Sequence, residues 1–546
     1  MDWLKEYKRW QENADDETKK ELENLSEEEI KDRFYRHLEF GTGGLRGVIG
    51  AGTNRINRYI VARATKGLAE YIIENKGDAS NESVVIAYDS RNFSRDFAKT
   101  AADILSFNGI KAYLFDELRP TPELSFAIRY KNATAGIVIT ASHNPAKYNG
   151  YKVYWSDGGQ IPPEIARKIL NKINNIDVFN VDEGSNEQLI EYVGEEIDNA
   201  YIESVYMQSV NPDVKKDNFK LVYTPLHGSG NKPVRKILKR SGFENVIVVE
   251  SQEKPDGNFP TVKSPNPENK KCFDIAIDLA KQNNVDLIIG TDPDSDRMGI
   301  VVKNKTGEYV TMTGNQVGIM LLDYILSSQE LPKNPAVVTT IVSTRMADII
   351  CEKYGTKLFR TLTGFKFIGE KIYEFERDNS FTYMFGFEES YGYLKGTYCR
   401  DKDAVVASML TAEMAAYYAE KGLTLYEVMN NLYKQYGGYY EELESITFEG
   451  IEGANKIKQI MRLFRENTPN KIGKCRIEKL TDYLKDTDLP KSDVLYFELD
   501  NDVHFVVRPS GTEPKVKIYY LSKGVTFEEA KIKATATKKA VNAIMK

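Results

Sequence analysis

Short apolar runs recur along the chain, and each one is followed by a segment with helical periodicity. SVVIAYDSR at 83–91 precedes FAKTAADILSFNG, FKLVYTPLHGSG at 219–230 precedes KPVRKILKRSG, and PAVVTTIVST at 335–344 precedes RMADIICEKYG. Strands that alternate with helices predict parallel sheets covered on both faces. In such sheets the functional groups collect in the loops beyond the carboxyl ends of the strands.

The two ends of the chain follow different patterns. Residues 1 to about 40 predict helices, with a capping box from Ser26 to Glu29. Toward the other end, DVLYFELDNDVHFVVRPSGTEPKVKIYYLSKG predicts three short strands followed by a helix. We expect three similar α/β domains with mixed, mostly parallel sheets and a C-terminal α+β domain. The expected ranges are 1–205, 206–310, 311–440 and 441–546.

Composition excludes several classes of protein. The 546 residues carry a formal net charge of −6, so neither nucleic acid nor an anionic membrane is expected as a partner. The N-terminus lacks a signal-peptide core, and the best candidate membrane span, AVVASMLTAEMAAYYA, is interrupted by Ser408, Thr411 and Glu413. Four cysteines without CxxC spacing indicate buried thiols rather than disulfides or zinc ligands. We expect a cytoplasmic protein.

The segment GTDPDSDRMG at 290–299 is the strongest local signal for chemistry. It follows the apolar run VDLII and places Asp292, Asp294 and Asp296 at alternating positions. Carboxylates this close repel one another unless a cation or several donors gather them, and oxygen ligands favour Mg²⁺ or Ca²⁺. An EF-hand would need glycine and glutamate where this chain has Arg297 and Lys303. A solvated acidic turn is the alternative interpretation.

TASHNP, from Thr140 to Pro145, follows the apolar run AGIVI and presents a serine in a turn. The G-x-S-x-G elbow of hydrolases is absent, and His143 is a poor base for the adjacent Ser142 because neighbours on an extended chain point apart. Near a Mg²⁺ site, the serine could instead carry a phosphoryl group whose oxygens complete the metal's ligand set. A serine that caps a helix is an equally good interpretation from the residues alone.

Three further segments contain candidate ligands for anions and sugars. RPSGTEPKVKIYY suits a phosphate dianion, although an ordinary turn would look the same and the Walker pattern is absent. FGFEESYGYL offers a carboxylate and a hydroxyl for vicinal sugar hydroxyls, or a carboxylate satisfied within its loop. FGTGGLRGVIG places an arginine among glycines but does not fit the dinucleotide pattern. The residues concerned are Arg508, Ser510, Gly511 and Thr512; Glu388 and Ser390; Arg46; and two candidate cations elsewhere, Lys152 and Lys366.

Taken in order, these five motifs resemble the α-D-phosphohexomutase superfamily, from Gly41 to about Lys517. TASHNP, DPDSDR and RPSGTEPK are each specific to it. GTGGLRG and GFEESYGY look like the phosphoglucomutase branch, which also contains phosphopentomutases. The resemblance implies four domains around a central cleft and a reversible intramolecular phosphotransferase.

The resemblance also implies a role for each matching residue. Ser142 looks like the phosphorylated serine, and its phosphate would join Asp292, Asp294 and Asp296 around one Mg²⁺ per subunit. Lys152 or Lys366 would move the proton at the sugar hydroxyl, with His143 as a further candidate. The remaining assignments are Arg46 and Arg297 near the active phosphate, Glu388 and Ser390 at the sugar hydroxyls, and Arg508, Ser510, Gly511 and Thr512 at the non-reacting phosphate.

The expected reaction interconverts glucose 1-phosphate and glucose 6-phosphate, with glucose 1,6-bisphosphate as intermediate and activator. The bacterial bifunctional phosphomannomutase/phosphoglucomutase type has histidines where this chain has Phe365-Lys366 and Tyr391-Gly392. Glucose phosphate is therefore the expected substrate, pentose phosphate the second candidate and mannose phosphate the third. A glucose 1,6-bisphosphate synthase and a non-catalytic sugar-phosphate-binding protein are the rival classes. Small sugar phosphates are the expected partners, and the expected state is a monomer or weak homodimer.

Overall fold

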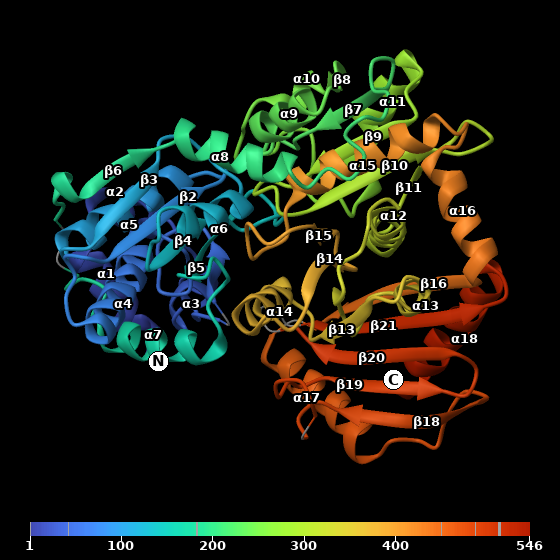
Figure 1. Cartoon of the computed structure of the whole chain (residues 1–546). Coiled ribbons are helices and arrows are strands. Elements are labelled where there is room, and N and C mark those ends of the chain that lie inside the picture. Colours follow the sequence, from blue (N-terminus) through green and yellow to red (C-terminus); the bar gives the residue numbers. More distant parts are fainter. Residues whose placement is uncertain are drawn as a thin grey trace.

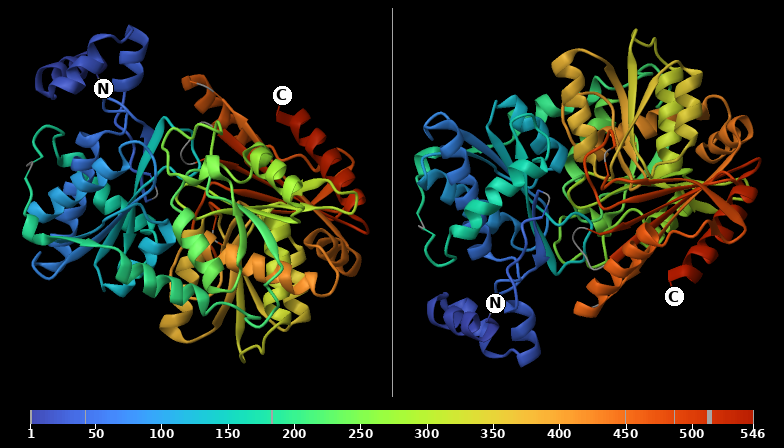
Figure 2. Two further views of the ribbon diagram at one scale, coloured as in Figure 1. Left: turned by 90° about the horizontal axis from the view of Figure 1, so that it is seen from above. Right: turned by 90° about the horizontal axis from the view of Figure 1, so that it is seen from below.

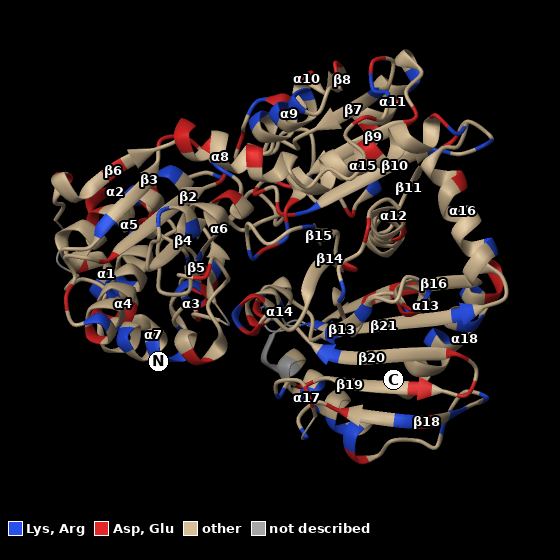
Figure 3. Ribbon diagram, in the orientation of Figure 1, with Lys and Arg blue, Asp and Glu red and all other residues tan. Residues whose placement is uncertain are grey.

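The chain folds around four β-sheets in a computed structural model that describes residues 2–41, 43–181, 184–448, 450–485, 487–510 and 515–545. We call these sheets, with the helices around them, domains I to IV; Figure 1 shows them following one another from blue to red. Acidic and basic residues are interspersed over all four domains (Figure 3). The boundaries expected near 205, 310 and 440 fall within elements of this structure and stay a prediction.

Domain I is a mixed sheet in the order β1-β5-β4-β2-β3-β6. Strands β4, β2, β3 and β6 run parallel, with β6 at one edge, whereas β5 and β1 are antiparallel to their neighbours. Gly150 in β5 allows the close approach beside the serine loop, because a Cβ there would lie 2.4 Å from the Thr140 carbonyl oxygen. The strands are Gly44–Val48, Ser83–Tyr88, Lys111–Phe115, Ala135–Ile139, Tyr148–Trp155 and Ile190–Val193 (β1 to β6), and the helices are Arg58–Lys76, Ser94–Phe107, Thr121–Tyr130, Pro163–Asn175 and Glu195–Tyr206 (α4 to α8).

Domains II and III repeat the strand–helix theme. Their sheets have the orders β11-β10-β9-β7-β8 and β13-β12-β14-β15. Strands β9, β7 and β8 are parallel, as are β13, β12 and β14, whereas β10, β11 and β15 pair antiparallel with their neighbours. The strands are Lys220–Thr224, Asn245–Val248, Leu287–Thr291, Met298–Lys303 and Tyr309–Thr311 (β7 to β11), then Pro335–Thr340, Lys357–Thr361, Thr382–Glu388 and Gly392–Leu394 (β12 to β15). The helices are Asn231–Arg240, Glu250–Glu253 and Asp274–Asn283 (α9 to α11), then Gly314–Ser327, Met346–Lys353, Phe365–Asp378, Ala404–Ala419 and Leu425–Tyr436 (α12 to α16).

Domain IV is an antiparallel sheet in the order β16-β21-β20-β19-β18-β17, in contact with its own helices α17 and α18. The three strands and final helix predicted from sequence are confirmed as β19, β20, β21 and α18. The prediction named none of the elements β16, β17, β18 and α17. The bounds are Gly438–Thr447, Lys471–Ile472, Cys475–Asp482, Leu495–Leu499, Val503–Pro509 and Lys515–Gly524 (β16 to β21), with Gly450–Glu466 (α17) and Phe527–Met545 (α18).

The apolar segment singled out as the best membrane candidate is a buried core helix, α15. Its residues belong to a hydrophobic core that continues through domains I, II and III. Glu413 is tolerated within it because its carboxylate accepts the N–H groups of Val210 and Asn211, each at 3.0 Å. Among the residues that the structure describes, no helix is both long and apolar enough to cross a lipid bilayer.

The predicted N-terminal helices are α1 (Trp3–Asn13), α2 (Asp16–Glu23) and α3 (Glu27–Phe34), and the capping box at Ser26 is confirmed. They lie on the outside of domain I (Figure 2). Trp10 is fully buried and contacts the rings of Phe34, Tyr59 and Phe179 edge-on at 5.3–5.8 Å between centroids. These contacts attach the helices to the rest of the domain.

Replacing Trp10 by Ala should release the three N-terminal helices from domain I. Removing a buried indole costs about 3–5 kcal/mol, so amide hydrogen exchange should accelerate throughout α1, α2 and α3. Leu4→Ala is the control, because Leu4 is 44% exposed and should leave exchange unchanged. Unchanged protection in Trp10→Ala would show that other contacts hold the helices.

Candidate functional site

Ser142 lies just beyond the carboxyl end of β4, in a turn whose shape is unusual for serine. Its φ is +49°, its side chain is buried, and its N–H donates to Thr140 Oγ1 at 2.8 Å. The described residues that follow, 143–147, form turns, and then β5 begins at Tyr148. The interpretation of Ser142 as a helix cap is therefore wrong, because the chain continues into a strand.

Arg91 holds the turn around Ser142 through hydrogen bonds to its backbone carbonyl groups. Its guanidinium donates to the carbonyl oxygens of Ser142 and Asn144, and at 3.0 Å to those of Pro145 and Tyr148. Asp89 balances its charge, with 3.3 Å between Nε and Oδ2. A guanidinium offers several donors in one plane, so a single side chain can hold a turn of four carbonyls in one conformation.

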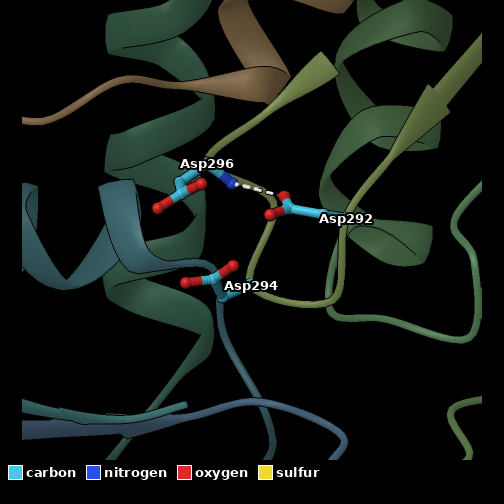
Figure 4. A group of neighbouring side chains, drawn as sticks. All are labelled: Asp292, Asp294 and Asp296. Atoms are coloured by element: carbon cyan, nitrogen blue, oxygen red, sulfur yellow. Dashed lines mark hydrogen bonds between the residues drawn. The ribbon is translucent and has the colours of Figure 1, made fainter. Parts of the chain in front are cut away.

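The three aspartates of DPDSDR line one buried turn between β9 and β10 (Figure 4). One carboxylate oxygen from each lies within 4.8 Å of the others. Asp292 Oδ1 accepts the N–H groups of Asp296 at 3.1 Å and Arg297 at 3.0 Å. Asp292 Oδ2 and Asp294 Oδ1 are also buried, yet accept no hydrogen bond from any described residue. Unpartnered anionic oxygens at this depth fit a cation.

The local charges shift the pKa values of Asp292 and Asp294 in opposite directions. Burial, together with the charges of Asp294 and Asp296, raises the pKa of Asp292 well above its ordinary value. Burial also opposes the charged form of Asp294, but Lys152 and Lys402 outweigh it and lower the pKa of that carboxyl. A divalent cation would favour the charged form of all three groups at once.

Ser142 contacts the acidic turn directly, across the boundary between domains I and II. Its Oγ donates to Asp294 Oδ2 at 3.1 Å. Lys152, in β5, donates to Ser142 Oγ at 2.9 Å and to Asp294 Oδ2 at 3.1 Å. The structure thus brings together the serine, a lysine and the aspartates that the sequence singled out, while their roles stay predictions.

Three more predicted residues surround this centre. Arg297 donates to Glu268 at 2.7 Å, and Arg46, in β1, donates to Asn144 Oδ1 at 3.4 Å. Burial and the positive charges of Arg297 and Arg46 hold the pKa of His143 well below its ordinary value. His143 is therefore neutral near pH 7.

Domain III contributes the predicted carboxylate. Glu388 ends β14 and accepts the Gly364 N–H at 2.8 Å, and burial together with Glu389 raises its pKa to about 7. Ser390 lies half-buried in the turn that follows. Lys366, in the first turn of α14 and two residues after Gly364, has its pKa lowered by burial. The sugar-hydroxyl candidates and one lysine candidate thus lie near one loop.

Domain IV reaches the same loop through Arg508. This residue lies in β20, and its guanidinium donates to Thr363 Oγ1. Lys517 pairs with Arg508 in the β20–β21 register, and burial together with the charge of Arg508 lowers the pKa of the lysine. The Ser510 N–H donates to the Lys515 carbonyl at 2.8 Å. Gly511 and Thr512 lie outside the described residues.

Sequence reasoning missed several residues of the site, of which Lys402 is the most central. This lysine comes from domain III, and its Nζ lies 2.7 Å from Asp296 Oδ2. Asp296 and Asp401 raise its pKa despite burial. The signal was the charged run CRDKD directly before the apolar helix α15, since charges beside a buried helix need partners. Arg91, Thr121 and Lys517 were missed as well: Arg91 and Thr121 lie outside the motifs, and Lys517 lies in the segment RPSGTEPKVKIYY, of which only Arg508, Ser510, Gly511 and Thr512 were singled out.

Curated relatives match nearly the whole chain. It is 36% identical over 544 residues to the phosphoglucomutase of Staphylococcus aureus strain MRSA252, covering 96% of this chain and 97% of the relative. It is 38% identical over 514 residues to the phosphoglucomutase of Staphylococcus haemolyticus, covering 91% and 92%.

Solved structures share the fold at lower sequence identity. The open form of parafusin, a Paramecium phosphoglucomutase, superposes with a TM-score of 0.70 at 18% identity, covering 93% of this chain and 95% of that one. A phosphoglucomutase/phosphomannomutase family protein of Burkholderia thailandensis gives 0.68 at 18% identity, covering 92% and 97%.

Family profiles account for the first three domains. The phosphoglucomutase/phosphomannomutase α/β/α domains I, II and III match residues 37–179, 199–307 and 313–436. With these matches in chain order, and with relatives 36–38% identical over most of their length, the chain belongs to the phosphoglucomutase/phosphomannomutase family of the α-D-phosphohexomutase superfamily.

Proposed function

We propose that this protein is a phosphoglucomutase, which interconverts glucose 1-phosphate and glucose 6-phosphate through a phosphorylated Ser142 and a glucose 1,6-bisphosphate intermediate. The observation that carries the proposal is the position of Ser142 Oγ, 2.9 Å from Lys152 Nζ and 3.1 Å from Asp294 Oδ2, beside three buried aspartates. The names of the curated relatives support glucose phosphate as the substrate.

Mg²⁺ is the cation we assign to the acidic turn. Asp292, Asp294 and Asp296 would hold it through oxygens such as Asp292 Oδ2 and Asp294 Oδ1, which lack other partners among the described residues. Carboxylate oxygens alone, with no imidazole or thiolate, are the ligand set of a hard cation. When bound, the cation supplies positive charge beside the transferring phosphoryl oxygens.

The protein's own residues perform the remaining steps of the transfer. As the phosphoryl group leaves Ser142, negative charge develops on Oγ, and the Lys152 ammonium that donates to this atom stabilises it. The accepting sugar hydroxyl must lose a proton. Lys366 stays our candidate to accept that proton, since burial lowers its pKa and so favours the neutral amine.

Binding of the non-reacting phosphate falls to domain IV. Arg508 and Lys517 are two cations on adjacent strands of its sheet, and Arg508 contacts Thr363 in the loop that precedes Lys366 and α14. Glu388 would accept the sugar hydroxyls between the two phosphate positions. The non-reacting phosphate is then bound in one place and the phosphoryl transfer takes place in another. The bisphosphate intermediate requires this, because its two phosphates take turns as the reacting group.

The first test compares turnover of glucose 1-phosphate, ribose 1-phosphate and mannose 1-phosphate with Mg²⁺, with and without the matching bisphosphate. We expect glucose 6-phosphate to form fastest, and Ser142→Ala to lose all but a trace of activity, because the covalent carrier is gone. About a tenth of the activity or more in Ser142→Ala would remove the serine from this role. Preference for ribose would overturn the sugar and keep the mechanism, and dependence on an acyl phosphate donor would indicate a bisphosphate synthase.

Asp292→Asn tests the metal assignment with little change of shape. The amide oxygen can still accept the Asp296 and Arg297 N–H groups, while the anionic oxygen without a partner is lost. Affinity for Mg²⁺, measured by isothermal titration calorimetry, should fall by about tenfold or more. Asp278→Asn is the control, because Asp278 is exposed on α11. Equal affinity in all three proteins would contradict the assignment.

Glu388 predicts a pH dependence of substrate binding. Its raised pKa of about 7 means that the carboxyl loses its proton between pH 6 and 8. A carboxylate accepts stronger hydrogen bonds from hydroxyls than its neutral form, so KM should fall as pH rises. The ratio of wild-type KM to the KM of Glu388→Gln should fall about fivefold from pH 6 to pH 8. Ionisation of the substrate phosphate affects both proteins equally, so it cancels in this ratio. A ratio independent of pH would show that Glu388 does not contact the sugar.

A further inference from the structure

We propose that Thr121 is a positioning residue for the metal loop: it holds Asp294 from domain I and fixes which oxygen of that carboxylate is left for the cation. The inference rests on the proposed function for its chemistry. The described residues show no hydrogen bond between Thr121 and Ser142, whereas Thr121 bonds Asp294 directly, so we assign it a role through Asp294.

Two hydrogen bonds join Thr121 to Asp294 across the boundary between domains I and II. The Thr121 N–H donates to the Asp294 carbonyl oxygen at 2.9 Å, and Thr121 Oγ1 donates to Asp294 Oδ2 at 3.0 Å. Both residues are completely buried. One residue therefore fixes the backbone and the side chain of the central aspartate at the same time.

The two oxygens of Asp294 have opposite surroundings. Oδ2 accepts from three donors, namely Thr121 Oγ1, Ser142 Oγ and Lys152 Nζ, at 3.0–3.1 Å. Oδ1 is buried and accepts from none of the described residues. Saturating Oδ2 determines the rotation of the carboxylate and leaves Oδ1 as the oxygen available to a cation.

Phosphorylation of Ser142 makes the Thr121 donor more important. In the phosphoserine, Oγ is bonded to phosphorus and has no hydrogen, so Ser142 can no longer donate to Asp294. Lys152 is then shared with the phosphoryl oxygens, which carry more charge than the hydroxyl they replace. The Thr121 hydroxyl is the donor to Oδ2 that the reaction leaves unchanged.

The start of α6 is held firmly enough for this task. Arg119, two residues before Thr121, donates from its backbone N–H to the Tyr88 carbonyl at 3.0 Å. Its guanidinium donates to Asp198 at 2.7 and 3.0 Å and to Asp116 at 3.1 Å. Prolines on both sides of Thr121 restrict the backbone further. The hydroxyl is thus placed before any cation or phosphate is bound.

Thr121→Val and Thr121→Ser separate the hydroxyl from the packing of the side chain. Valine keeps the shape and the backbone N–H but removes the donor, whereas serine keeps the donor. We expect Mn²⁺ affinity, measured by electron paramagnetic resonance without substrate, to fall about tenfold in the phosphorylated valine variant. The fall should be smaller in the unphosphorylated protein, where Ser142 still donates. The serine variant should remain within about threefold of wild type.

The protein is phosphorylated with glucose 1,6-bisphosphate, and the extent of phosphorylation is measured by mass spectrometry of the intact protein. Turnover is measured separately. In the valine variant kcat should fall, with KM for the sugar phosphate changed less than about twofold, because the substrate contacts are untouched. Wild-type affinity in the valine variant, or equal losses with serine and valine, would overturn the inference. If wild type binds Mn²⁺ but converts no sugar phosphate, the proposed function fails while the comparison of affinities still decides the role of Thr121.

Discussion

Three aspartates must remain close together inside the protein, and the rest of the structure depends on how that repulsion is met. Burying one charge without a partner costs several kcal/mol, and three within one turn repel each other as well. The answer here is cations and donors from different domains: Lys152 and Thr121 from domain I, Lys402 from domain III, and backbone N–H groups within the turn. The acidic turn is therefore a contact point of three domains.

Contacts from several parts of the chain also fix the position of Ser142. Arg91 holds the carbonyls of the serine turn, and the turn presents Oγ to the oxygen of Asp294 that Lys152 and Thr121 also contact. Domain IV contacts the loop before α14 through Arg508. Turns held by several hydrogen bonds near the centre fit a reaction that depends on positioning charged groups rather than on many bond-making side chains.

The local pattern of apolar and polar residues predicted those helices and strands whose sequences have a clear helical or strand periodicity. The pairs β2–α5, β7–α9 and β12–α13, the capping box at Ser26 and the last three strands are found where the sequence indicated. Pattern failed for β1, because the glycines around Arg46 gave no strand signal and the pairing partner β5 supplies the strand instead. It also left open a helix after Ser142, which the structure replaces by turns, since the segment there is held by a distant arginine that no local rule includes.

The sequence by itself determined which residues could carry chemistry, because spacing within one segment is enough to put three carboxylates in one turn or a serine beyond a buried strand. Only the tertiary structure decided which of these meet. Lys402 lies 106 positions after Asp296, and Thr121 lies 173 before Asp294. Contacts at such separations depend on how whole domains pack, and packing is set by buried surfaces spread over the chain rather than by any one motif.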